Sequence, residues 1–302
     1  MSAAIQYIAR KEIDIDKWDQ CIAGADNGLI YGYSWYLDHM ADNWDGLVLN
    51  DYEAVMPLTW KRKYTIKYLY QPAFCQQLGV YGKKAVYQNQ IPGFLSAAQQ
   101  AFRFMEIYFN FDNAHAGAIA KNNFILPLNK SYEQLYQDFK YNLKHDISKA
   151  QKEGLSYHPL SDYSKAIELY RAAYGKRFRH VTNADYIRLH SLCSDLYKRG
   201  DLLVRTTGSG NNLVALSLLL HMNERLYLIL SVTLPEGRRL RANHFHINGL
   251  IQEFSNRALI LDFEGSDIPG VAHFYKSFGA VNQPYYYFRS NHLPRLVRWL
   301  KG

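Results

Sequence analysis

Two stretches of this 302-residue chain repeat one pattern, in which three apolar segments of strand length are separated by turn residues. The first stretch contains residues 45–50, 52–58 and 66–70, and the second contains residues 201–206, 212–220 and 225–231. Asn, Asp and Gly stand between the segments, and these residues favour tight turns. Each stretch therefore predicts a three-stranded meander. A helix and another apolar strand follow in both halves, so we expect two similar units of mixed α and β structure.

The remaining elements follow from hydrophobic periodicity and capping residues. We expect further strands over residues 5–8, 104–109, 122–128, 155–158, 258–262 and 284–288. We expect helices over residues 14–23, 34–41, 91–102, 164–174, 183–199, 242–256, 272–278 and 293–300, and a helix pair between residues 131 and 152. The connection between the units is placed inside that helix pair, which gives an N-terminal domain of residues 1–137 and a C-terminal domain of residues 138–302.

Composition limits the class of protein. Apolar residues make up 48% of the chain, which is typical of a globular protein with a core. The three cysteines lie far apart in sequence, so they favour a reduced, cytoplasmic setting. The N-terminus lacks the basic and apolar segments of a signal peptide, and no run approaches the ~18 apolar residues of a membrane span.

The charge is concentrated in the second half of the chain. Residues 1–137 carry a net charge of −1, whereas residues 138–302 carry +9. This asymmetry indicates a phosphate-bearing small molecule, a nucleic acid or an acidic membrane as partner, although a merely soluble basic surface explains it equally well. Lys140, Lys144, Lys149 and Lys152 recur near helical spacing and form a basic face, either solvated or bound to nucleic acid.

Several common sites are not indicated. The sequence has no Gly-x-Ser-x-Gly elbow, no P-loop and no dinucleotide fingerprint. His244 and His246 would project about 200° apart on a helix, so they do not predict one metal site. We therefore expect no metal centre.

Three C-terminal motifs carry a family resemblance: Ser148-Lys-Ala-Gln-Lys-Glu-Gly154, Leu261-Asp-Phe-Glu-Gly-Ser266 and Phe274-Tyr-Lys-Ser-Phe-Gly279. In the N-terminal half, Trp44-Asp-Gly46, Met56-Pro-Leu58 and Gln71-Pro-Ala-Phe-Cys-Gln-Gln-Leu-Gly79 add to it. With the order of the elements, these motifs resemble the FemABX-type and BioF2-like transferases, which are tandem GNAT-fold proteins. The resemblance implies an α+β fold of two GNAT-like domains, each a mixed, mostly antiparallel sheet flanked by helices.

The resemblance also implies an activity. Such enzymes move an aminoacyl or acyl group onto an amine, here of a cell-envelope precursor such as one of peptidoglycan, or of a related small molecule. The residues fix no cofactor; aminoacyl-tRNA or an acyl thioester is implied as donor, and tRNA as a partner. A CoA-dependent N-acetyltransferase and a non-catalytic ligand-binding protein remain as alternatives.

Three residues are candidates for catalysis. Lys276 matches the lysine that the family associates with the donor end and the tetrahedral intermediate, and the aromatic residues beside it would desolvate part of its stem. Asp262 and Glu264 stand two apart at the end of a buried strand and would point the same way if the strand continued. Either one would orient or deprotonate the acceptor amine. The alternatives are a solvent-edge lysine and structural carboxylates.

Other residues are candidates for binding phosphate or substrate. Arg238, Arg239 and Arg241 occupy the place where acetyl-CoA-using GNAT enzymes carry a glycine-rich loop. The missing glycines argue against acetyl-CoA, whereas the guanidinium groups suit a phosphate. Lys61 and Lys63 form a basic cluster on a predicted hairpin. The FemAB-like segment of residues 71–79 adds a glutamine pair to the candidates, Gln76 and Gln77.

Overall fold

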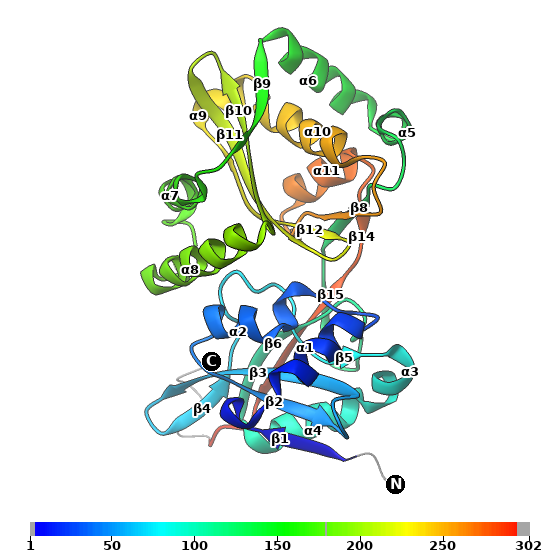
Figure 1. Ribbon diagram of the computed structural model, residues 1–302, viewed down its shortest axis with the longest axis vertical. Helices are drawn as coiled ribbons and strands as arrows, with labels where there is room; N and C mark the ends of the chain where they lie inside the picture. The colour runs from blue at the N-terminus through cyan, green and yellow to red at the C-terminus, as the bar shows by residue number, and fades with distance from the viewer. Residues whose placement is uncertain (1–3, 179, 295–302) are drawn as a thin grey trace. The chain divides into compact units, whose positions relative to one another are not determined.

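The computed structural model describes residues 4–178 and 180–294, and the chain divides into two compact units (Figure 1). The first unit comprises Met1–Lys121 and Pro284–Gly302, and the second comprises Asn122–Gln283. The chain therefore passes from one unit to the other twice, after Lys121 and after Gln283. No helix within the described residues is long and apolar enough to cross a membrane.

In its described part the first unit is built on an eight-stranded sheet of order β1-β2-β3-β4-β6-β15-β7, with β5 paired to β3. Its strands are β1 (Ile5–Ile8), β2 (Trp44–Leu49), β3 (Ala54–Lys63), β4 (Ile66–Leu69), β5 (Tyr81–Gly82), β6 (Phe104–Phe109), β7 (Ile119–Lys121) and β15 (Tyr285–Asn291). Its helices are η1 (Arg10–Glu12), α1 (Ile15–Gly24), η2 (Ile30–Gly32), α2 (Ser34–Met40), α3 (Lys84–Tyr87), η3 (Gln88–Gln90) and α4 (Ile91–Ala101).

The second unit, over the residues described, has a seven-stranded sheet of order β14-β8-β13-β12-β11-β10-β9. Its strands are β8 (Phe124–Pro127), β9 (Leu155–Leu160), β10 (Leu202–Ser209), β11 (Asn212–Met222), β12 (Arg225–Thr233), β13 (Ile260–Asp262) and β14 (Val281–Asn282). Its helices are α5 (Tyr132–Gln137), α6 (Tyr141–Lys152), α7 (Tyr163–Tyr174), α8 (Asn183–Arg199), α9 (Pro235–Arg239), α10 (Ala242–Phe254) and α11 (Pro269–Ser277).

The two sheets share one strand order. In each, an antiparallel meander (β2-β3-β4 or β10-β11-β12) is followed by a parallel neighbour, β6 or β13. Beyond that neighbour lies an antiparallel strand from a distant part of the sequence, β15 beside β6 and β8 beside β13. The predicted fold class of two tandem, mostly antiparallel α+β units is confirmed.

The predicted single boundary between residues 137 and 138 differs from the division that the structure shows. Residues 122–137 belong to the second unit because β8 pairs with β13 and β14. Residues 284–294 belong to the first unit because β15 pairs with β6 and β7. Both departures come from strand pairing between residues more than a hundred positions apart, which a local pattern does not report.

Local signals explain where several helices begin and end. Asp14 caps α1 by accepting a hydrogen bond from the Lys17 N–H, at 3.2 Å. Capping boxes open α5 and α8. Gly200 ends α8 in the left-handed region, at φ 80°. The predicted helix over residues 293–300 falls largely outside the described residues, and α11 begins at Pro269, three residues before the predicted start.

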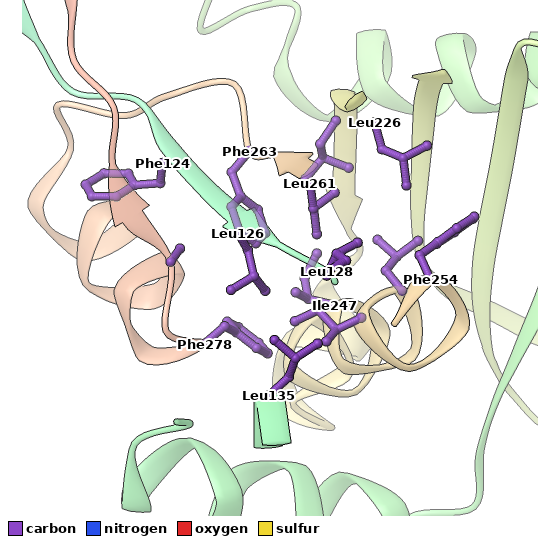
Figure 2. Close-up of a cluster of buried hydrophobic side chains, with 14 of the residues drawn as sticks. Phe124, Leu126, Leu128, Leu135, Leu226, Ile247, Phe254, Leu261, Phe263 and Phe278 are labelled. Atoms are coloured by element: carbon purple, nitrogen blue, oxygen red, sulfur yellow. The ribbon is translucent and has the colours of Figure 1, made fainter. Parts of the chain in front are cut away.

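A hydrophobic cluster joins the elements of the second unit (Figure 2). Ile247 and Phe254 of α10 face Leu226 of β12 and Leu261 of β13, while Phe278 follows α11. Burying each such side chain stabilises the fold by about 1.5–3 kcal/mol. In Figure 1, α10 lies on one side of β10 and β11, and α7 and α8 lie on the other. A separate cluster under α4 forms the core of the first unit.

Candidate active site of the second unit

The strands β12 and β13 separate after a short parallel ladder. Residues Arg225–Tyr227 pair with Ile260–Asp262, but β12 continues to Thr233 without a strand partner on that side within the described chain. The register against β11 shifts at the same point, where Leu219 lies opposite both Leu228 and Ile229, as in a β-bulge. A bulge leaves one residue out of the ladder. The bulge and the separation of the two strands therefore fall at the same place in β12.

Aromatic residues surround the end of β13. Tyr275 of α11 stacks on Phe263, with ring centroids 4.4 Å apart. Burial raises the pKa of the Tyr275 hydroxyl, and the nearby Glu264, Tyr174 and Tyr170 act in the same direction. Tyr275 is therefore a neutral phenol at pH 7 and a hydrogen-bond donor.

Lys276 is the next residue of α11, and its side chain is exposed. Its Nζ lies 5.4 Å from the centroid of the Phe124 ring. The aromatic residues expected to desolvate part of its stem, Phe274, Tyr275 and Phe278, belong to the core cluster or pack against it. Phe124 places the ammonium near the end of β13, since the Phe263 N–H donates to the Phe124 carbonyl at 2.9 Å.

The predicted alignment of Asp262 and Glu264 required the strand to continue past Asp262, and it does not. The strand ends at Asp262, and Glu264 has a left-handed backbone with φ 62°, so the alternation of side chains stops. Asp262 is buried and forms an ion pair with Arg225, 2.6 Å between Oδ2 and NH1. Its Oδ1 accepts from the Asn123 side chain and from the Glu264 N–H, each at 3.0 Å. Through these bonds Asp262 holds the loop after β13 in place.

The three arginines have different surroundings. Arg238 and Arg239 are exposed on the short helix α9. Arg241 precedes α10 in the left-handed region, at φ 55°, and its Nε donates to Oδ1 of Asp146 at 2.8 Å. The same carboxylate lies 3.8 Å from Nε2 of His244. Asp146 thus binds the one arginine that stands at the start of α10.

A cavity of about 410 Å³ lies at Asp146 and His244. Its lining also includes Lys140, His273 and Phe274. Burial lowers the pKa of His244, an effect that the Asp146 charge partly offsets. Nδ1 of His244 is buried and has no hydrogen-bond partner in the described part of the protein. Asp146 and His273 were not among the residues predicted from the sequence, because their neighbours in space lie far away along the chain.

The candidates of the first unit are engaged in local contacts. Nζ of Lys61 lies 2.5 Å from Oδ2 of Asp42 and 4.3 Å from the centroid of the Tyr70 ring. Lys63 is exposed at the end of β3.

The glutamine pair is also bonded within the first unit. Gln77 is fully buried and accepts from the Phe111 N–H at 3.0 Å, while its amide donates to Gln76 at 2.6 Å. The two side chains therefore shape the segment of residues 71–79.

The first unit has a cavity of about 580 Å³ near β2 and β3. Several of its polar groups are engaged: Arg10 pairs with Asp38 at 2.6 Å, and Asp45 accepts from the indole of Trp60 at 2.7 Å. Nζ of Lys67 lies 3.9 Å from the Trp60 ring centroid. These contacts leave few unengaged polar groups for a ligand.

Among the residues described, no three His, Cys, Asp or Glu side chains are grouped so as to hold a metal ion. His244 lies beside Asp146, whereas His246 is buried between Thr207 and Ser217. The two imidazoles therefore have different partners and lie in different surroundings.

Comparisons with known proteins identify a similar domain in the second part of the chain. Residues 137–276 match the family model described as an acetyltransferase (GNAT) domain. No curated protein matches the sequence significantly.

Similar solved structures cover nearly the whole chain. A crystal structure of FemX is 13% identical, with a TM-score of 0.67, and the match covers 98% of this chain and 100% of that one. The C-terminal domain of a protein assigned as a lysylphosphatidylglycerol synthetase from Agrobacterium fabrum is 11% identical, with a TM-score of 0.57 and coverage of 97% and 95%. A tandem GNAT protein from the clavulanic acid biosynthesis pathway is 10% identical, with a TM-score of 0.56 and coverage of 96% and 99%. The chain therefore has a tandem GNAT-like fold, and its residues 137–276 match the GNAT acetyltransferase domain.

Proposed function

We propose that this protein transfers an aminoacyl or acyl group onto an amine, at the place where β12 and β13 separate. The observation that carries the proposal is the bulge in β12 at the end of the parallel ladder. In acyl transfer the carbonyl oxygen gains negative charge, and fixed donors at that oxygen lower the barrier. Backbone N–H groups at the bulge and the ammonium of Lys276 are donors of this kind.

Besides Lys276, the proposed reaction uses Glu264 and Tyr275 for proton transfer and Asp262 for positioning. The acceptor amine forms a bond to the carbonyl carbon, and the bond from that carbon to the leaving oxygen or sulfur breaks. Glu264 takes the proton that the amine loses, and Tyr275 gives a proton to the leaving group. A phenol that stays neutral at pH 7 suits the second task. Asp262 acts through Glu264, because it fixes the backbone N–H of that residue.

The donor is proposed to be aminoacyl-tRNA rather than an acyl thioester. The +9 charge of residues 138–302 suits a polyanion. Two of the similar structures are named as FemX and a lysylphosphatidylglycerol synthetase, and the second name itself describes transfer of a lysyl group. Within the second unit, the exposed Arg238 and Arg239 remain the proposed phosphate contacts. The acceptor is proposed to be an amine of a cell-envelope precursor, modified in the cytoplasm.

Mass spectrometry tests the proposal. The protein is incubated with a mixture of aminoacyl-tRNAs, or separately with acetyl-CoA, and with an amine-bearing peptide linked to a nucleotide sugar. We expect the peptide to gain the mass of one aminoacyl residue. Tyr275→Phe, which removes only the hydroxyl, should slow the transfer and leave the thermal unfolding midpoint nearly unchanged. Transfer from acetyl-CoA alone would favour the N-acetyltransferase, and binding without transfer would favour the ligand-binding protein.

A further inference from the structure

The match to a GNAT acetyltransferase domain raises the question of whether the second unit fits acetyl-CoA, which carries a diphosphate. Helix N-termini attract such anions, because unpaired N–H groups and the helix dipole point there. In the matched region α10 is a 13-residue helix without a side-chain cap at its start. The backbone N–H groups of Ala242 and Asn243 make no hydrogen bond within residues 4–178 and 180–294. The end of α10 therefore has the donors that an anion needs.

An anion of the protein itself already lies at this end. Asp146 of α6 holds Arg241 at 2.8 Å and lies 3.8 Å from His244. The carboxylate is about one-third exposed, and it lines the same 410 Å³ cavity as His244. The Arg241 guanidinium at the start of α10 is thus neutralised by a carboxylate of the same unit.

The residues present do not fit a diphosphate. A bound diphosphate would meet the like charge of Asp146 at short range, where screening by solvent is only partial. Arg241, its natural partner, is already engaged, and His244 is neutral at pH 7 because burial lowers its pKa. The side chains of Ala242 and Asn243 stand where a glycine-rich turn would let a phosphate approach the backbone.

We infer that Asp146 is a specificity-determining residue, whose carboxylate closes the N-terminus of α10 to the diphosphate of CoA. The acyl group that the second unit transfers is therefore carried by a different donor. This inference rests on the proposed function, because Asp146 can select an acyl donor only if the protein transfers an acyl group. The residue itself takes no part in the chemical step.

Isothermal titration calorimetry on the full chain tests this, with acetyl-CoA and inorganic pyrophosphate as probes. We expect very weak or no binding to the unmodified protein. Asp146→Asn should bind both probes at least about tenfold more tightly, because it keeps the shape and removes the charge. The double variant Asp146→Asn, Arg241→Met should bind the probes no more tightly than the unmodified protein, because it lacks the Arg241 guanidinium that the first substitution releases. Asp195→Asn is the matched control: it removes one carboxylate from α8 and should change nothing.

Two results would overturn the inference. One is binding of acetyl-CoA to the unmodified protein as tight as to Asp146→Asn; the other is a folded Asp146→Asn protein without any gain. Thermal unfolding checks the fold, and Asp146→Ser replaces the first variant if that one is unfolded. These binding results are independent of transfer. If Asp146→Asn binds the probes no more tightly but the unmodified protein transfers an aminoacyl group, only the inference is wrong. If Asp146→Asn binds them more tightly but no transfer is found, only the proposed function is wrong.

Discussion

Arg225 and Asp262 form a buried pair, and removing one partner leaves the other charge without compensation. Their side chains are 11% and 1% exposed. We expect Arg225→Met to lower the free energy of unfolding by about 3–5 kcal/mol, as for other broken buried pairs. Urea unfolding measures the change. Arg238→Met, which removes an exposed arginine, should stay within about 0.5 kcal/mol of the unmodified protein. Equal effects of the two substitutions would mean that the pair does not hold the loop after β13.

Lys276 offers the sharpest residue-level test of catalysis. Because its side chain is exposed, Lys276→Met should leave the unfolding midpoint nearly unchanged. If the ammonium stabilises the developing oxyanion, the transfer rate should fall by about 10²–10³-fold. Lys198→Met on α8 is the control, since Lys198 is similarly exposed and should leave the rate unaltered. An unchanged rate in Lys276→Met would remove this lysine from the mechanism.

At the scale of elements, His246 joins α10 to two strands of the sheet. Its Nδ1 is 2.9 Å from the Thr207 hydroxyl of β10, and its Nε2 is 2.9 Å from the Ser217 hydroxyl of β11. Burial lowers the pKa of His246 to about 3, whereas an unfolded imidazole titrates near 6.5. The unfolded state therefore binds one more proton between these pH values. This stability is complete above about pH 6.5 and is lost as the pH falls toward 3.

The expected slope of this loss is about 1.4 kcal/mol per pH unit. His246→Gln removes the titrating group, so its free energy of unfolding should vary less steeply between pH 4 and 6.5. Denaturant unfolding at a series of pH values measures both slopes. His190→Gln, at an exposed histidine of α8, should keep the slope of the unmodified protein. Identical slopes in His246→Gln would show that the buried imidazole is not the acid-sensitive group.

At the scale of the whole molecule, the two units differ in how much continuous chain they need. A fragment of residues 122–283 contains every strand of the second sheet, so we expect it to fold alone with a cooperative thermal transition. A fragment of residues 1–121 lacks β15, the strand between β6 and β7, and should be unfolded or aggregated. Circular dichroism and thermal unfolding of both fragments check this. A cooperatively folded fragment of residues 1–121 would contradict the role given to β15.

Local patterns predicted most elements of both units, because meanders, caps and amphipathic helices are encoded by neighbouring residues. Asp14 and the strand over residues 104–109 are examples in which the structure agrees. The positions of β8 and β15 were not predictable from such patterns, since their partners lie far away in sequence.

The site shows the same division between local and distant information. The sequence identifies Asp262 as a polar residue at a strand end, but its partner Arg225 belongs to a different strand. Arg241 likewise is visible as a cation at a helix start, whereas Asp146 comes from α6. Burial and partner choice are set by tertiary packing, which a single sequence does not report.

The return of β15 to the first unit has a consequence for synthesis on the ribosome. Most of the first unit emerges before the second, yet its sheet is incomplete until residues 285–291 have been made. At translation rates of 5–20 residues per second, β6 waits roughly 10–35 s for its partner. During this interval β6 has an open edge, which is a template for wrong pairing. The part of the protein that is made first is therefore the part that finishes folding last.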